Sequence, residues 1–246
     1  QNATDCVIEE NDFVRPYSYL ILYQACQRNR VRYNSFTNGL STFMELNGTA
    51  CFDNKISHNF FTDGVGFGIR MLAGAHHNLI SFNTTHSNGI ELIGLNRDAH
   101  HNRIIGNHAE GCGDNGISIT GYSNICVANI CIGNENSGIF LFGRDNVCVG
   151  NTCKNNGILY ATNGGLQWAG IQISGRFGGT GQGNVVTGNE IDDDQAVPTQ
   201  YDPIRVEGVS YPSWATATAY AAGSYIKNDL NIYYTVAGGT SGATSP

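Results

Sequence analysis

Short runs of alternating apolar and polar residues repeat along most of this chain of 246 residues. Each repeat contains the motif Asn-x-(Ile/Val/Cys)-x-x-Asn, as in Asn54 to Asn59 and Asn78 to Asn83. Successive motifs begin 22 to 25 residues apart, with one longer step of 38, at Asn29, Asn54, Asn78, Asn102, Asn124, Asn146 and Asn184. A period of this length is typical of a solenoid, whose repeats bury their apolar faces only by stacking on one another.

Each repeat predicts short strands joined by tight turns. The second residue after the first Asn is apolar in every motif, which gives an inward column of Val31, Ile56, Ile80, Ile104, Cys126, Cys148 and Val186. A second short run usually opens with Gly-Ile, as in Gly68 to Met71. Apolar and variable residues alternate in it with a period of two, as in a half-buried strand. No window has the period of a capped helix. We therefore predict an all-β fold, a right-handed single-stranded parallel β-helix whose repeated Asn side chains form amide ladders.

The repeat ends before the C-terminus. Beyond residue 209 no further Asn motif occurs, and aromatic residues are separated by Ala, Thr and Gly. We expect the parallel β-helix over residues 1–209 and a small β module or connector over residues 210–246. Because the first residue is Gln1 rather than Met, we also expect a processed form or a part of a longer protein.

Composition narrows the classes of partner. Charged residues make up 13% of the chain, and its formal net charge is −7. We expect no nucleic-acid partner, because the phosphate backbone requires a basic surface. No apolar run approaches the ~20 residues of a membrane-spanning helix, so we expect no membrane insertion.

The eight cysteines are interpreted as core residues. Four of them have the spacing of metal ligands, but they fall in inward columns where other repeats place Ile, Val or Phe: Cys126, Cys131, Cys148 and Cys153. A free thiol is a small hydrophobic group, so this pattern favours burial over a zinc site. Cys26 and Cys51 fall on adjacent coils, where a disulfide or a reduced pair fits, and we favour the reduced pair.

Outward positions on the Gly-Ile strands carry the main candidate chemistry. The residue after each Gly-Ile pair should point outward, which gives a column of Arg70, Glu91, Ser118, Phe140 and Gln172, with Glu45 before Arg70. Glu45 and Glu91 would lie two coils apart, about 9–10 Å at the backbone. They could then be the paired acids of an inverting glycosidase, with Arg70 binding a sugar carboxylate or developing charge. The alternative is a Glu-Arg-Glu charge ladder on an exposed sheet.

Turns near these strands add further candidates. His86 and Asp114 are predicted on the same side as Arg70, where they could line an acidic groove and act as general acid or base. Ordinary turn residues on the surface are the alternative. The pairs His76-His77 and His100-His101 could bind a transition metal, but a ladder of stacked identical side chains is favoured. Asp192 to Asp194 could bind Ca²⁺, although a solvated acidic turn is favoured, and no other cofactor is expected.

The longest step contains an inserted loop with two large aromatic residues. Tyr160 and Trp168 could stack on sugar rings, because aromatic faces suit the apolar C–H surfaces of a sugar. They could equally cap the core or pack against a neighbouring subunit. With the outward Gln172, they form the predicted substrate-binding set on the coils.

The repeated Asn motifs and Gly-Ile strands resemble the right-handed β-helix superfamily of pectate-lyase-like proteins. That superfamily includes polysaccharide lyases, glycoside hydrolases, mannuronan C5-epimerases and bacteriophage tailspikes. The tail, with Trp214, Tyr220 and the pair Tyr233-Tyr234, resembles small aromatic modules related to chitin-binding domains. The resemblance implies a polysaccharide partner, an extracellular or virion-surface location, a homotrimer, and Trp214 as a further sugar-binding residue.

Three functions remain open at this point. The first is a tailspike-type depolymerase that hydrolyses glycosidic bonds with Glu45 and Glu91. The second is a lyase or epimerase acting on uronates, with His86 or a tyrosine as base and Arg70 neutralising the acid. The third is a spike segment that binds glycan without cutting it. The aspartate cluster and catalytic arginine of pectate lyases and the Asp-Pro-His motif of the epimerases are not found in the sequence.

Overall fold

The computed structural model describes residues 3–15, 20–96, 98–158, 169–174, 181–196, 198–200 and 202–207, together with four short strands nearer the C-terminus. The chain divides into two compact units, Gln1–Glu207 and Gly208–Pro246. In the second unit β25 (Ala219–Tyr220) pairs with β28 (Gly239–Thr240), and β26 (Tyr225–Asn228) pairs with β27 (Asn231–Tyr234). Both of these pairs are antiparallel.

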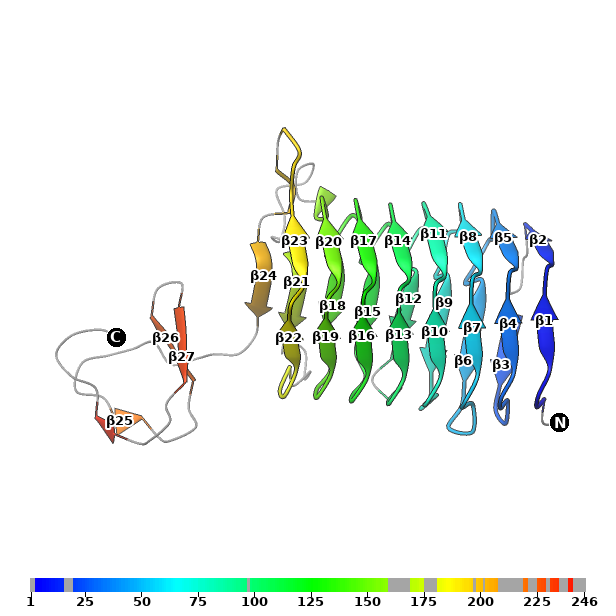
Figure 1. Cartoon of the computed structure of the whole chain (residues 1–246), viewed down its shortest axis with the longest axis horizontal. Coiled ribbons are helices and arrows are strands. Elements are labelled where there is room, and N and C mark those ends of the chain that lie inside the picture. The colour runs from blue at the N-terminus through cyan, green and yellow to red at the C-terminus, as the bar shows by residue number, and fades with distance from the viewer. Residues whose placement is uncertain are drawn as a thin grey trace. The chain divides into compact units, whose positions relative to one another are not determined.

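The first unit is a parallel β-helix in which every coil gives one strand to each of three sheets (Figure 1). Sheet 1 contains β1 (Val7–Glu9), β4 (Arg30–Arg32), β7 (Lys55–Ser57), β10 (Leu79–Ser81), β13 (Arg103–Ile105), β16 (Ile125–Val127), β19 (Val147–Val149) and β22 (Val185–Thr187). Sheet 2 contains β2 (Asp12–Val14), β5 (Ser35–Thr37), β8 (Phe60–Thr62), β11 (Thr84–His86), β14 (His108–Glu110), β17 (Ile130–Ile132), β20 (Thr152–Lys154) and β23 (Glu190–Asp192). The predicted all-β, right-handed parallel solenoid is confirmed.

Sheet 3 completes each coil and carries the pocket described below. It contains β3 (Leu20–Tyr23), β6 (Met44–Asn47), β9 (Ile69–Leu72), β12 (Ile93–Leu95), β15 (Ile117–Ile119), β18 (Ile139–Leu141), β21 (Ala169–Ser174) and β24 (Asp202–Glu207). Every strand pairs with its counterpart one coil away, so the sheets run along the solenoid axis.

The core consists of the inward columns predicted from the repeat. In sheet 1, Ile80 is the register partner of both Ile56 and Ile104, and all three are fully buried. All eight cysteines are free, and all but Cys6 are buried. Burial raises the pKa of Cys51 to about 12, so its thiol is neutral. The interpretation of the cysteines as apolar core residues is confirmed for the seven buried ones and is wrong for Cys6, which is exposed.

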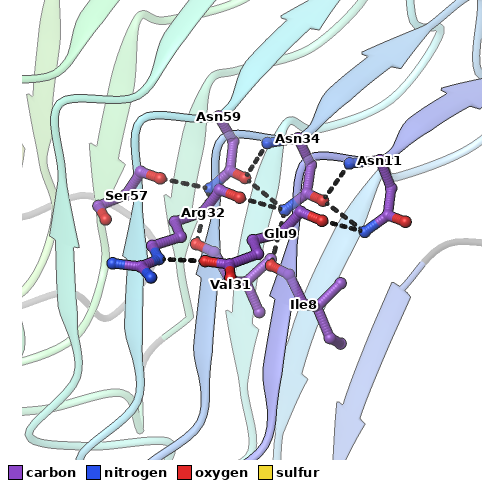
Figure 2. Close-up of polar contacts among 8 residues, drawn as sticks. All are labelled: Ile8, Glu9, Asn11, Val31, Arg32, Asn34, Ser57 and Asn59. Atoms are coloured by element: carbon purple, nitrogen blue, oxygen red, sulfur yellow. Dashed lines mark hydrogen bonds and ion pairs between the residues drawn. The ribbon is translucent and has the colours of Figure 1, made fainter.

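Two ladders of asparagine side chains hold the coils together. Figure 2 shows the start of one ladder, in which the Asn34 amide donates to Oδ1 of Asn59 at 3.0 Å and to the carbonyl of Ile8 at 3.0 Å. The backbone N–H of Asn34 donates to the same Asn59 oxygen at 3.1 Å. Each amide thus satisfies buried backbone groups at a turn that has no sheet partner for them. The predicted ladders are confirmed.

The residue before each asparagine of this ladder adopts a left-handed conformation. Tyr33, His58 and Phe82 have φ of 56°, 56° and 55°, and Gly106 follows with φ of 64°. Positive φ is costly for bulky residues, so the surrounding hydrogen bonds must impose it. This conformation places three aromatic rings on the surface beside sheet 1, where all three are exposed.

A candidate site on sheet 3

A pocket of about 370 Å³ opens on the outward face of sheet 3. Its volume lies within the usual range for small-ligand pockets. It is formed by β9, β12, β15 and β18 and by residues just before and after these strands. The lining residues are Phe67, Arg70, Glu91, Gly94, Leu95, Asn96, Asp114, Asn115, Ser118, Thr120 and Phe140. It therefore brings together Arg70, Glu91 and Asp114, three of the five residues predicted to be catalytic.

Glu91 reaches this pocket from a position that differs from the predicted one. The outward column runs from Glu45 to Arg70 and then to Gly94, not to Glu91. The strand of this coil is β12, which starts at Ile93, whereas Gly89 to Leu92 form the turn before it. The assignment of Glu91 to the outward column was wrong, because inward Ile93 pairs with Ile69 and Ile117 and sets the register.

In the outward column Gly94 contributes no side chain, and the ring of Phe67 covers its place beside Glu91. A Cβ placed on Gly94 would lie 2.6 Å from a ring carbon of Phe67 and 3.0 Å from Glu91 Oε2. Any side chain at this position would therefore fill the pocket or displace Phe67. A glycine weakens a strand, and it is typical of a site where another molecule approaches closely. We infer that a ligand in the pocket approaches Oε2 past Gly94.

The Glu91 carboxyl group is held in a buried and polar setting. Ser118 Oγ and Asn115 Nδ2 both donate to Oε1, the latter at 3.1 Å. Among the described residues, none donates a hydrogen bond to Oε2. Glu91 is 4% exposed, and burial, followed by the charge of Asp114, raises its pKa to about 8. The two hydrogen bonds and the charge of Arg70 oppose this shift without cancelling it.

Asp114 is the second carboxyl group of the pocket. Its Oδ1 accepts hydrogen bonds from the amides of Asn115, at 3.0 Å, and Asn136. Burial raises the pKa of Asp114, while the bonds from Asn136 and from the Asn115 backbone lower it. Because Asn115 Nδ2 bonds both acids, Glu91 Oε1 and Asp114 Oδ1 are at most about 6 Å apart.

A cation and two aromatic rings complete the walls. The guanidinium of Arg70 lies over the ring of Phe67, 5.1 Å from its centroid, and remains half-buried. Phe140 follows Ser118 in the outward column and is also half-buried. The pocket thus offers two acids, one cation, amide groups and apolar rings within a single cavity.

The other predicted residues lie elsewhere. Glu45 is 6% exposed and accepts a hydrogen bond from Asn47 at 2.9 Å, but it does not line the pocket. His86 ends β11 on sheet 2, where its Nδ1 is 3.7 Å from Glu110 Oε2, so it is not on the same side as Arg70. Gln172 is 3% exposed and accepts a hydrogen bond from Ser137 at 2.9 Å. Tyr160, Trp168 and Trp214 lie outside the described residues.

Sequence reasoning did not select Gly94, Asn115 or Ser118 as functional residues. A usable signal was present, because Ile69, Ile93 and Ile117 are evenly spaced by 24 residues, as their register requires. Gly89 lies only 21 residues after Gly68 and breaks this spacing. Following the even spacing would have placed Gly94 in the outward column.

The histidine pairs form the stacked ladder favoured from the sequence. His76 stacks on His100 with ring centroids 4.9 Å apart, and His77 stacks on His101 at 5.1 Å. Within the described ranges, no three His, Cys, Asp or Glu side chains are grouped as metal ligands would be.

The acidic run at the end of sheet 2 already has donors of its own. Asp194 pairs with Lys154 at 2.6 Å, and Asp193 accepts hydrogen bonds from the backbone N–H groups of Thr199 and Gln200.

No helix in the described part of the chain is both long and apolar enough to cross a membrane.

Comparison with known proteins settles the family. A family model described as a right-handed beta helix region matches residues 1–127 and 71–211. The chain belongs to the right-handed β-helix family. This β-helix is similar to the crystal structure of the Dettilon tailspike protein (gp208), with 14% identity and a TM-score of 0.50. The match covers 94% of this chain and 60% of the tailspike chain, and at this identity it shows the fold alone. No curated protein matches the β-helix chain.

Proposed function

We propose that the chain binds a polysaccharide in the pocket at Gly94 and hydrolyses a glycosidic bond there. The observation that carries this proposal is the Glu91 carboxyl group, whose pKa of about 8 keeps it protonated at neutral pH. A neutral carboxylic acid in a ligand pocket is the group that a glycosidase uses to protonate the leaving oxygen of the glycosidic bond. The family and the likeness to a tailspike fold support a carbohydrate ligand.

The hydrogen bonds favour Oε2 as the oxygen of Glu91 that holds the proton in this mechanism. Ser118 and Asn115 donate to Oε1, which then serves as the acceptor. Oε2 lies beside Gly94, and both residues line the pocket. A sugar in the pocket would therefore meet an O–H donor. This geometry suits general-acid catalysis, which requires the acid within hydrogen-bond reach of the leaving group.

Asp114 is the partner acid in this mechanism. Burial raises the pKa of Asp114, the amide donors oppose this shift, and the charge of the Asp114 carboxylate contributes to the raised pKa of Glu91. Retaining glycosidases have carboxyl groups about 5–5.5 Å apart, and inverting enzymes about 6.5–9.5 Å. The upper limit of about 6 Å between Glu91 Oε1 and Asp114 Oδ1 favours the retaining arrangement, with Asp114 as nucleophile.

Arg70 and the aromatic walls bind and orient the sugar. Arg70 can pair with an acidic substituent, since a guanidinium fits a carboxylate in bidentate fashion. Phe67 and Phe140 offer apolar surface to sugar C–H groups. We extend the proposal to an extracellular or virion-surface protein that assembles as a homotrimer, for which the tailspike likeness is the support.

The test is incubation of the purified chain with neutral and uronate-containing polysaccharides, following new reducing ends and the ultraviolet absorbance of unsaturated uronates. Wild type is compared with Glu91→Gln and Glu45→Gln, two isosteric changes at buried acids in or near sheet 3. We expect reducing ends without ultraviolet absorbance, a loss of at least about 100-fold in Glu91→Gln, and activity retained in Glu45→Gln.

Each other outcome selects a different account. Unsaturated products would replace hydrolysis by a lyase reaction. Equal losses in both variants would restore the Glu45–Glu91 pair expected from the sequence. Binding of a glycan without any product would leave the chain as a glycan-binding segment. Full activity in Glu91→Gln would remove the pocket at Gly94 from the mechanism.

A further inference from the structure

A column of cations runs along sheet 1, on a different sheet from the Glu91 pocket. Arg30, Lys55, Leu79 and Arg103 are successive register partners on β4, β7, β10 and β13. These strands lie side by side in Figure 1. Arg30, Lys55 and Arg103 are exposed, and none forms an ion pair with a described residue. Adjacent coils are about 4.8 Å apart, so the charges are placed at multiples of that spacing.

The column lies in a groove of about 490 Å³. Its charged lining comprises Arg28, Arg30, Lys55 and Arg103 with Asp5 and Asp53. Asp5 neutralises Arg28 through an ion pair of 2.7 Å. Four cations against two carboxylates leave a surplus of positive charge, although the whole chain carries a net charge of −7. The positive charge of this groove, on a chain that is negative as a whole, attracts an anionic ligand to this face.

Rows of aromatic rings border the groove at both ends of the strands, stacked in the first row and tilted in the second. Three residues before the cation column, Phe52, His76, His100 and Tyr122 stack with centroids 5.1, 4.9 and 4.9 Å apart. Directly after the strands, Tyr33, His58 and Phe82 form a second series, at 5.0 and 5.3 Å. Both series follow the solenoid axis, so the cations lie between two rows of rings.

Stacking determines what these rings can offer a ligand. The interplanar angles of His76 with Phe52 and with His100 are 8° and 6°, so neighbouring rings cover each other's faces. Both ring nitrogens of His76 and Nδ1 of His77, His100 and His101 already have partners. The polar ring atoms left to a ligand are Nε2 of His77, His100 and His101 and the hydroxyl of Tyr122. The rows therefore present hydrogen-bonding groups at the spacing of the coils.

We propose that this face of sheet 1, over β4, β7, β10 and β13, binds a uronate-containing polysaccharide at a site separate from the Glu91 pocket. Arg30, Lys55 and Arg103 pair with carboxylates of the chain. The imidazole and tyrosine edges bond its hydroxyl groups. The site holds the polymer on the solenoid, and its existence does not require cleavage.

A single-stranded nucleic acid is the other anionic polymer to consider, and the geometry disfavours it. Such ligands gain affinity when bases stack on free aromatic faces. In the row of Phe52, His76, His100 and Tyr122 the faces between neighbours are already covered. Hydroxyl-rich sugars need only the edges, so an acidic polysaccharide fits the surface better.

The test measures binding to three probes: polygalacturonate, the neutral glucan dextran and a single-stranded oligonucleotide. All proteins carry Glu91→Gln, so that turnover does not remove the ligand. The test variant adds Lys55→Gln and Arg103→Gln. The matched control adds Arg15→Gln and Lys154→Gln, which remove one Arg and one Lys outside sheet 1. Circular dichroism establishes that both variants are folded.

We expect the test variant to bind polygalacturonate about tenfold more weakly than the parent, and the control to change by less than about twofold. Equal weakening in the two variants would overturn the proposal, as would equal affinity of the parent for dextran and polygalacturonate. Tighter binding of the oligonucleotide would overturn it in favour of nucleic acid. A further outcome is that the Glu91→Gln parent still cleaves glycan while the test variant binds polygalacturonate more weakly than the parent and the control do. In that case the proposed role of Glu91 in hydrolysis fails and the proposed binding site stands.

Discussion

Ser118 on β15 donates a hydrogen bond to the carboxyl group of Glu91, which lies 27 residues earlier in the turn before β12. The bond joins neighbouring coils and fixes Oε1 as an acceptor. Oε2 lies beside Gly94 in the pocket. Because its pKa is raised to about 8, this buried acid keeps its proton at neutral pH.

The rate of cleavage should fall as the pH rises through about 8. Glu91 must carry its proton to act as general acid, and its pKa is raised to about 8 by burial and by the charge of Asp114. The measurement is kcat/KM against pH on a uronate or neutral glycan that the chain cleaves. A rate that stays constant from pH 7 to well above 9 would exclude Glu91 as the acid.

Glu91→Gln should stabilise the fold at neutral pH while abolishing cleavage. The folded pKa is raised above the ordinary value of 4.5, so the unfolded chain releases this proton first. The stability due to neutral Glu91 is fully present below pH 4.5 and is lost, at up to about 1.4 kcal/mol per pH unit, as the pH rises to about 8. Urea unfolding at pH 5 and pH 8 measures the difference.

The comparison that decides this point is the slope of stability against pH. Wild type should lose more stability than Glu91→Gln between the two pH values, because Gln has no proton to lose. Parallel losses in the two proteins would show that Glu91 has an ordinary pKa.

Gly94→Ala should close the pocket while leaving the solenoid folded. The added methyl would lie 2.6 Å from Phe67 and 3.0 Å from Glu91 Oε2, so the Phe67 ring must shift toward the pocket. We expect cleavage to fall by at least about 100-fold and the far-ultraviolet circular dichroism to be unchanged. Unchanged cleavage by a folded Gly94→Ala protein would mean that the ligand does not enter beside Oε2.

Asn83→Ala should destabilise the β-helix by about 3 kcal/mol or more. Asn83 donates to Asn107 Oδ1 and to the carbonyl of Ile56, each at 3.0 Å, and its loss leaves buried backbone groups without partners. Asn11 is the matched control, since it is the exposed first member of the same ladder, and its alanine variant should lose about 1 kcal/mol or less. Equal losses in urea unfolding would show that the ladder contributes no more inside the solenoid than at its end.

The fold could be predicted because its signals are local and repeated. Asn54 and Asn78 occur in equivalent motifs, and stacking alone places equivalent residues one above the other. The site was less predictable, since its coil contains a misleading copy of the strand signal. Gly89-Ile90 resembles the start of a strand, yet Ile93 enters the core. Placing this strand three residues too early put Glu91 in the outward column, where the structure has Gly94.

The chemistry of Glu91 could not be obtained from sequence for a further reason. Its raised pKa arises from burial and from the position of Asp114, and both depend on how two turns from neighbouring coils pack. No spacing along the chain records that Asn115 bonds both acids. The pairing of these acids therefore emerged only from the structure.

The protonation state of Glu91 is the point on which the proposed mechanism depends most. It can be measured by carbon-13 NMR of the glutamate carboxyl groups across a pH titration, with Glu91→Gln assigning the resonance. A midpoint near pH 8 is expected. A midpoint near the ordinary value of 4.5 would contradict the mechanism, because Glu91 would then have no proton to donate at neutral pH.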